Sequence, residues 1–139
     1  MTRLMKLAAI ALISGSCSPA IAAQPEGLTV QAGESWIFRV ENGQPADARK
    51  VDANAEPAKG ELKVTLDHSM GTTMLVSNKT DHWYNYQAFA TAEPGSKGVR
   101  TSVCTLGAGI SAFENWPQPI PAIRITNFTE TGEGAMVCQ

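Results

Sequence analysis

Two histidines, each preceded by an aspartate, are the residues of this chain best suited to chemistry. Asp67-His68 is followed by Ser69, so an acid, a base and a nucleophile stand in a row. Successive residues of an extended chain point to opposite faces, whereas a hydrolytic triad needs its groups to converge from separate segments. The chain has no G-x-S-x-G motif, and His82 stands apart after Asp81. We therefore predict no catalytic residue and a protein that is not an enzyme.

Metal binding is the second chemistry that these residues suggest. His68 and Met70 share one expected turn, and together with Met74 they would offer the nitrogen and thioether ligands that suit copper in an oxidising compartment. His82 cannot join them, because a strand over 72–77 would hold the two histidines about 20 Å apart at roughly 3.3 Å per residue. The pattern favours an interpretation of the methionines as packing or turn residues, so we predict no cofactor. Copper binding is the alternative.

The densest aromatic group of the chain runs from His82 to Tyr86, with the sequence His-Trp-Tyr-Asn-Tyr. Trp and Tyr provide rigid, amphipathic contact area for carbohydrates or peptides. Tyr84 and Tyr86 share a strand face with Ala88 and are expected in the core, which leaves Trp83 as the exposed exception. We expect non-catalytic binding at two places, which are the turn with His68, Ser69 and Met70 and the corner with Asp81, His82 and Trp83.

The N-terminal residues 1–22 have the features of a cleavable signal peptide. Two basic residues precede an apolar run over 7–13, and an A-x-A pattern ends at Ala22. The run is shorter than the roughly 20 residues that span a bilayer, so no transmembrane segment is expected. We predict a periplasmic or secreted protein. The alternative is a lipoprotein anchored through Cys17, although Ser14 stands where a lipobox has leucine.

Cys104 and Cys138 are the two cysteines that remain after the predicted signal. An even number in an exported chain favours a disulfide, and the C-x-x-C spacing of redox-active pairs is missing. Bridging them would close a loop of about 35 residues and stabilise the fold by roughly 3 to 4 kcal/mol on the chain-entropy model.

Residues 23–139 are expected to form a single domain. Removing Arg3 and Lys6 with the signal leaves nine basic residues against 13 acidic ones, out of 11 and 13 in the whole chain. This mild acidity argues against nucleic-acid binding and against a polybasic membrane anchor. The expected partner is another envelope protein or a small ligand.

Apolar residues recur at every second position in short runs bounded by Gly, Pro, Asn and Asp, which is typical of strands. Leu62, Val64 and Leu66 give the clearest example. The segment Gln44–Lys59 has no sustained apolar stripe and is expected to be mostly a surface loop, with a short edge strand possible over 46–51. Seven strands are expected, over 35–40, 61–66, 72–77, 83–91, 99–106, 110–114 and 122–128.

About seven short strands predict an all-β fold, a small antiparallel β-sandwich of immunoglobulin-like architecture with one disulfide. The likeness is one of architecture only, because Cys138 lies at the extreme end of the chain. Such a domain would bind through loops at one end or through an unpaired edge strand. We therefore expect an exported binding module, with a copper-binding protein and an inhibitor of an extracellular hydrolase as the alternatives.

Two triplets, Asn78-Lys-Thr80 and Asn127-Phe-Thr129, match the N-glycosylation sequon. They carry meaning only in a eukaryotic secretory pathway. Because the short, Ala-rich signal resembles bacterial ones, we interpret both as turn and strand-edge residues.

Overall fold

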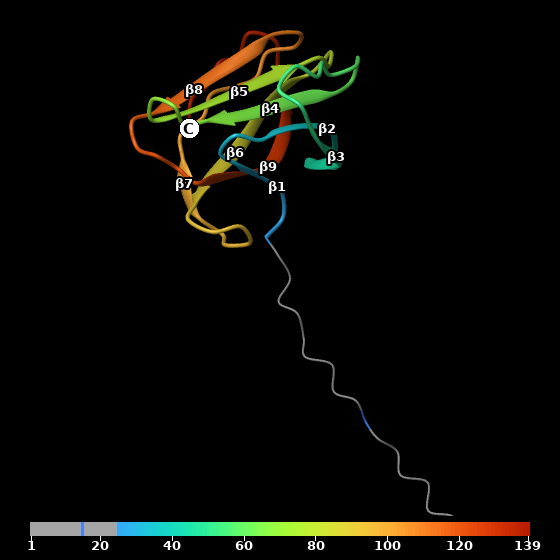
Figure 1. The fold of residues 1–139 in the computed structure, drawn as a ribbon. Coiled ribbons are helices and arrows are strands. Elements are labelled where there is room, and N and C mark those ends of the chain that lie inside the picture. The colour runs from blue at the N-terminus through green and yellow to red at the C-terminus, as the bar shows by residue number, and fades with distance from the viewer. Residues whose placement is uncertain (1–14, 16–24) are drawn as a thin grey trace, which may run out of the picture.

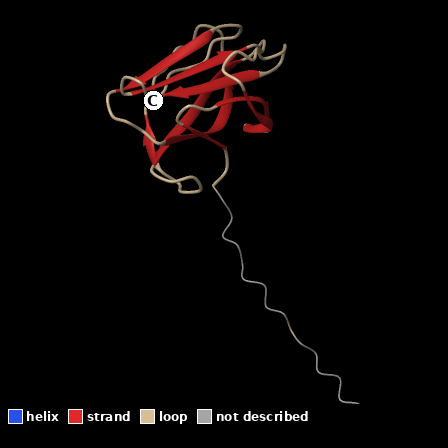
Figure 2. Cartoon of the chain, viewed as in Figure 1, coloured by secondary structure: helices blue, strands red, loops and turns tan. Residues whose placement is uncertain are grey.

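The computed structural model describes Gly15 and residues 25–139, in which it has nine strands and no helix (Figure 2). The all-β prediction is confirmed for this part of the chain. The predicted signal over 1–22, apart from Gly15, and the predicted lipidation site Cys17 lie outside the described residues. Within the described part, no helix is long and apolar enough to cross a membrane.

The strands form two antiparallel sheets that face each other (Figure 1). The four-stranded sheet has the order β1 (Leu28–Gln31), β9 (Ala122–Thr131), β6 (Trp83–Thr91) and β7 (Val99–Thr101). The five-stranded sheet has the order β3 (Gln44–Val51), β2 (Ser35–Glu41), β4 (Leu62–Asp67), β5 (Thr72–Asn78) and β8 (Ser111–Trp116). The fold is thus β-sandwich-like, as expected, whereas its likeness to immunoglobulin domains stays a prediction.

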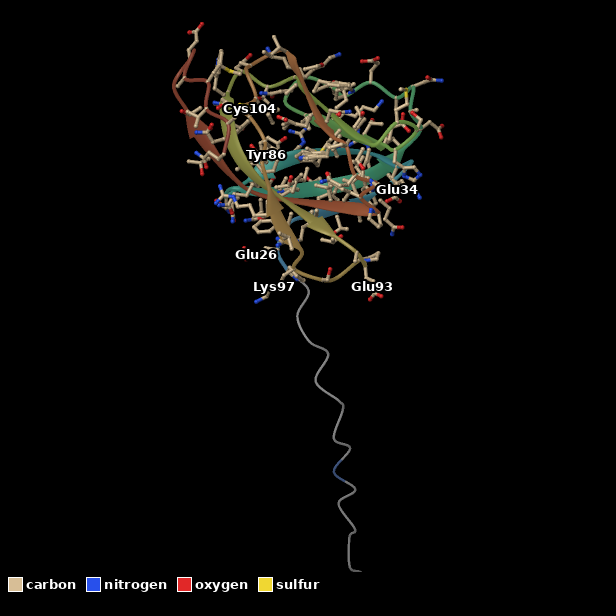
Figure 3. The ribbon with its side chains drawn as sticks, turned by 90° about the vertical axis from the view of Figure 1, so that its left-hand side faces the viewer. Glu26, Glu34, Tyr86, Glu93, Lys97 and Cys104 are labelled. Atoms are coloured by element: carbon tan, nitrogen blue, oxygen red, sulfur yellow. A yellow bond between two sulfur atoms is a disulfide. The ribbon has the colours of Figure 1, made fainter. Side chains whose placement is uncertain are left out.

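Alternating side chains from both sheets fill the space between them. Leu62, Val64 and Leu66 of β4 are fully buried, and Tyr84, Tyr86 and Ala88 of β6 face them from the other sheet, as the alternation predicts. Tyr86 lies inside the domain in Figure 3, well away from Glu26, Glu93 and Lys97 at the lower end. The buried face of each strand therefore follows directly from its period of two.

Phe128 joins the two sheets at the centre of this core. Its ring stacks on Tyr86 at 5.2 Å between centroids and meets Tyr84 edge-on at 6.0 Å and Phe38 at 5.7 Å. A β-bulge makes this possible, because the pairing of β6 with β9 shifts register between Asn85 and Gln87 and Asn127 takes a φ of 53°. The extra residue turns the Phe128 side chain inward.

Three sequence predictions about strands need correction. Gln44–Lys59 is not mostly a loop, because its first half forms the edge strand β3, which pairs with β2 although none of its side chains is buried. β1, absent from the expected set, adds another strand and brings the number in the described residues from about seven to nine. The run expected over 99–106 is a regular strand only over Val99–Thr101.

The predicted disulfide between Cys104 and Cys138 is confirmed. The two cysteines face each other in an isolated antiparallel bridge, flanked by backbone hydrogen bonds between Val103 and Gln139. Thr105 accepts a hydrogen bond at its hydroxyl from the Val137 N–H at 2.9 Å. Residues 137–139 are therefore held beside residues 103–105 by backbone hydrogen bonds and the disulfide.

Replacing Cys104 and Cys138 together by alanine should lower the free energy of unfolding by about 3 to 4 kcal/mol, because the bridge closes a loop with a sequence separation of 34. Urea denaturation followed by tryptophan fluorescence measures this difference. Reductant should cause a similar loss in the free energy of unfolding of the unaltered protein and no loss in that of the double variant. Equal stability of the two proteins under oxidising conditions would contradict a stabilising role.

Glu61 is a buried carboxylate that ties the segment between β3 and β4 to the five-stranded sheet. It accepts two hydrogen bonds from Arg49, at 2.8 and 3.2 Å, and a third from the Ala58 N–H at 2.9 Å. The Arg49 guanidinium, followed by the Ala58 N–H, lowers the pKa of Glu61 to about 2. The ionised form is therefore the one that stabilises the fold.

A depressed pKa gives stability that is complete above the ordinary value of 4.5 and is lost as the pH falls toward about 2. Between these values, we expect the free energy of unfolding to fall by up to about 3 kcal/mol more in the unaltered protein than in Glu61→Gln. Chemical denaturation at a series of pH values measures both slopes. The prediction fails if the two proteins lose stability in parallel.

Candidate functional site

Three adjoining hollows meet at one end of the domain, and all three are lined by Glu130 near the end of β9. Their volumes are about 570, 420 and 320 Å³. The first lies against the turn between β2 and β3, and the other two lie around Asp81 and His82. We refer to this region, from Asn42–Gln44 across Glu130 to Asp81–Trp83, as the Glu130 end.

Glu130 lies against His82, with 3.2 Å between His82 Nδ1 and Glu130 Oε1. Both side chains are more than half exposed, so the pair is open to solvent and to a ligand. The His82 ring also lies 6.1 Å from that of Tyr84. Burial, together with the nearby charge of Glu130, raises the pKa of Tyr84, which keeps its phenol protonated and able to donate a hydrogen bond.

A buried asparagine positions the corner that carries His82. Asn78 ends β5 and donates from Nδ2 to the His82 carbonyl at 2.9 Å and to the Gly107 carbonyl at 3.0 Å. Its Oδ1 accepts from the N–H and the hydroxyl of Thr80, at 3.0 and 2.7 Å. Every polar atom of the Asn78 side-chain amide therefore has a partner, and these hydrogen bonds hold the corner that carries His82 in place.

The turn between β2 and β3 forms the facing wall. Asn42 and Gly43 both have positive φ values, of 50° and 76°, which suits the two central residues of a tight hairpin turn. The Gly43 carbonyl accepts a hydrogen bond from the Phe128 N–H at 2.8 Å, so the turn docks onto the bulge of β9. A side chain at Gly43 would meet the Phe128 carbonyl oxygen at 3.0 Å, which favours glycine there.

The chemistry of the Glu130 end is that of recognition. Asp81, Glu130 and Glu133 offer carboxylates, Lys59 and His82 offer donors, and the hollows are also lined by Trp83, Tyr84 and the amides of Asn42, Gln44 and Asn127. Such a mixture of aromatic surface and convergent polar groups orients a bound molecule. Thr80 carries the hydroxyl that is nearest to His82 in the sequence. This hydroxyl is already hydrogen-bonded to Asn78 Oδ1 and to the backbone N–H and carbonyl of His82.

The structure brings three of the predicted site residues together and leaves three elsewhere. Asp81, His82 and Trp83 all line one hollow of the Glu130 end. His68, Ser69 and Met70 form the turn before β5, next to the Trp116 end of β8, because Thr72 pairs with Trp116 and Ser77 with Ser111. The two predicted surfaces therefore lie at opposite ends of β5, and Met70 projects into solvent with 87% of its surface exposed.

The residues of the copper hypothesis are divided between solvent and core. Met74 is fully buried on the inner face of β5, whereas His68 and Met70 are exposed in the turn. In the described residues, no three of His, Cys, Asp and Glu are grouped so that they could hold a metal ion. Burial of Met74 agrees with the interpretation of this residue as core packing.

Sequence reasoning missed Glu130, Asn127 and Gln44, which belong to the same end of the domain. Gln44 begins β3, 38 residues before His82, and Asn127 and Glu130 belong to β9, 45 and 48 residues after it. The pairing of Trp83 with Thr131 and of Tyr84 with Glu130 is what brings β9 to the predicted corner. Only a strand pairing, which one sequence does not reveal, could have identified them.

Comparison of the chain with protein-family models, with curated proteins and with solved structures finds no match.

Replacing Asn78 by alanine should lower the free energy of unfolding by about 2 to 4 kcal/mol, because it removes the shortest hydrogen bonds to the His82 and Gly107 carbonyls and leaves the buried Thr80 N–H without a partner. Asn115→Ala is the matched control, since its Nδ2 makes a single exposed bond to Thr73 and its loss should cost less than about 0.5 kcal/mol. Urea denaturation of both variants tests the prediction. Equal stabilities would show that the Asn78 bonds do not hold the corner.

Proposed function

We propose that this protein is an exported, non-catalytic binding module that takes a polar ligand, or a polar surface loop of an envelope protein, at the Glu130 end. The observation that carries the proposal is the convergence of three hollows on the His82–Glu130 pair. Exposed charged groups, the half-buried ring of Trp83, the buried ring of Tyr84 and a rigid hydrogen-bonded corner meet there. Binding sites preferentially combine such features in a concave surface that exists before the ligand arrives.

Binding through loops is favoured over strand addition because the long sheet edges carry features that discourage pairing. β3 contains Pro45 and a positive φ of 50° at Asp47, next to a register shift against β2. β8 has Glu114 on the same side as the core-facing Ala112, with its carboxylate accepting from the Cys104 N–H at 2.8 Å. A charged group that points inward from an edge strand disfavours a neighbouring strand.

Two further hypotheses from the sequence stay predictions. Copper binding through His68, Met70 and Met74 would require the buried Met74 to leave the core. Inhibition of an extracellular hydrolase would require a loop that fits an enzyme cleft, and no contact among the described residues favours one loop for that role. The Glu130 end is therefore the surface on which we base the function.

The opposite ends of β5 allow a matched test of this proposal. Asp81→Asn with Glu130→Gln alters the Glu130 end, and His68→Gln with Met70→Leu alters the other end at equally exposed positions. Each protein is used to capture ligands from an extract of its native envelope, followed by mass spectrometry. We expect the first variant to lose its specific ligand by about tenfold or more and the second to retain it.

Circular dichroism and urea denaturation should show that both variants keep the stability of the unaltered protein. The proposal is wrong if the first variant captures the same molecules in the same amounts, or if only the His68 and Met70 changes remove them.

A further inference from the structure

A row of uncharged amide side chains runs along the outer face of the four-stranded sheet, beginning beside the Glu130 end. Asn85 and Gln87 come from β6 and Asn127 from the facing bulge of β9. Together with Gln139 at the chain end, they surround a hollow of about 270 Å³. The side chains that line it are uncharged, and belong to Asn85, Tyr86, Gln87, Asn127, Thr129 and Gln139. Arg100 adjoins them, because its Nη2 donates to Gln139 Oε1 at 3.1 Å. We call Asn85, Gln87, Asn127 and Gln139 the amide strip.

Hydrogen bonds among side chains hold the amide strip in place. Gln44 Nε2 donates to Asn127 Oδ1 at 2.9 Å, and Asn127 Nδ2 donates to Gln87 Oε1 at 2.8 Å. The Thr126 hydroxyl donates to Gln44 Oε1 at 2.7 Å, and the Thr105 hydroxyl donates to Asn85 Oδ1 at 2.6 Å. Long polar side chains on a sheet surface lose rotamer entropy when they are ordered in this way, so the strip is organised before a ligand binds.

The same bonds leave hydrogen-bonding groups directed to solvent. Within the described residues, the NH2 groups of Asn85 and Gln87 have no partner, and neither does the hydroxyl of Thr129. Each bonded amide therefore still offers donors or acceptors on its outer side. A ligand that meets the strip must both donate and accept hydrogen bonds and needs no charge.

Asn127 adopts a left-handed backbone conformation, as Asn42 and Asp47 also do, and asparagine is among the residues with a side chain that take it most readily. Glycine would fill this position with less strain, yet the asparagine side chain links Gln44 to Gln87 across the hollow. The bulge thus supplies the central amide of the strip.

An aromatic ring completes the surface at one end. Trp83 precedes Asn85 by two residues on β6, so both side chains belong to the same face of the sheet, and Trp83 is half-buried. From Trp83 to Gln87 the strand extends about 13 Å at roughly 3.3 Å per residue. This length exceeds one sugar ring, and the flat indole can pack against the apolar C–H face of such a ring.

We propose that the amide strip and Trp83 bind a chain of neutral sugars, with vicinal hydroxyls on the amides and a ring on the indole. A hydroxyl both donates and accepts, which matches the free amide groups. The hollow of the strip is lined by uncharged side chains only, and the charged groups that adjoin the site are Arg100, on Gln139 Oε1, and the carboxylates of the hollow that contains Trp83. This inference rests on the proposed function and adds the chemical class of the ligand. Gln139 is held at the strip because the disulfide fixes residue 138.

Titration of the purified protein with chitotetraose, cellotetraose and maltotetraose, followed by amide chemical shifts in NMR, tests this assignment. We expect at least one of them to shift resonances of Asn85, Gln87 and Asn127 with millimolar or tighter affinity. Cosedimentation with purified peptidoglycan distinguishes a cell-wall polymer, for which chitotetraose should compete, from a free oligosaccharide, which should bind only in the soluble titrations. Either result supports the proposal.

Three variants make the test specific. Asn127→Gly removes the amide while suiting the positive φ, and Trp83→Ala removes the ring, so each should weaken binding by about tenfold or more. Phe113→Ala is the control, because this aromatic is also exposed but belongs to β8 in the other sheet. Thermal unfolding confirms that all three proteins are folded.

The proposal is overturned if none of the three oligosaccharides shifts these resonances, or if Asn127→Gly and Phe113→Ala bind equally well. Trilysine serves as a probe for the acidic Glu130 end alone. If trilysine binds there and the sugars do not, the proposed function stands and the sugar assignment fails. If envelope capture also shows no dependence on Asp81 and Glu130, both are wrong.

Discussion

The packing of Phe128 between the two sheets is the contact on which the rest of this structure depends. Its ring touches Tyr84, Tyr86 and Phe38, and its backbone N–H bonds to the Gly43 carbonyl, so one residue joins β9, β6 and the β2–β3 hairpin. Strict alternation from Ile123 and Ile125 would have turned Asn127 inward instead. The bulge exchanges the two, which places an aromatic ring in the core and an amide on the surface. Core packing and site geometry are therefore set by the same local irregularity.

Much of the architecture could be predicted because a strand with one buried face alternates apolar and polar residues in its sequence. Leu62 to Leu66 and Tyr84 to Ala88 alternate cleanly, and both segments are strands whose apolar side faces the core. The edge strand β3 shows no such alternation, because none of its side chains is buried, and backbone pairing with β2 and the contacts of Arg49 and Lys50 with Glu61 and Glu34 hold it in place. Hydrophobic patterning thus detects strands that bury a face and misses those that do not.

The candidate site was predictable only where its residues are neighbours in the chain. The corner from Asp81 to Trp83 was found from its dense aromatic and ionisable residues. Nothing in the sequence around Glu130 and Asn127 indicates a site. The register of β9 against β6, and a bulge that is not marked by a glycine, bring these two residues to the corner. The pairing of Cys104 with Cys138 could be inferred, because a count of cysteines needs no geometry.

The full burial of Asn78 has a consequence for how this chain is made. Asn78-Lys-Thr80 is an acceptor triplet for oligosaccharyltransferase, which modifies the amide nitrogen of chains as they enter the eukaryotic secretory pathway. That nitrogen is 2.9 and 3.0 Å from two carbonyls beneath the surface, where an attached glycan has no space. The native corner therefore requires unmodified Asn78. A bacterial expression host suits this fold, whereas a host that glycosylates the triplet would produce chains in which Asn78 cannot form the native corner.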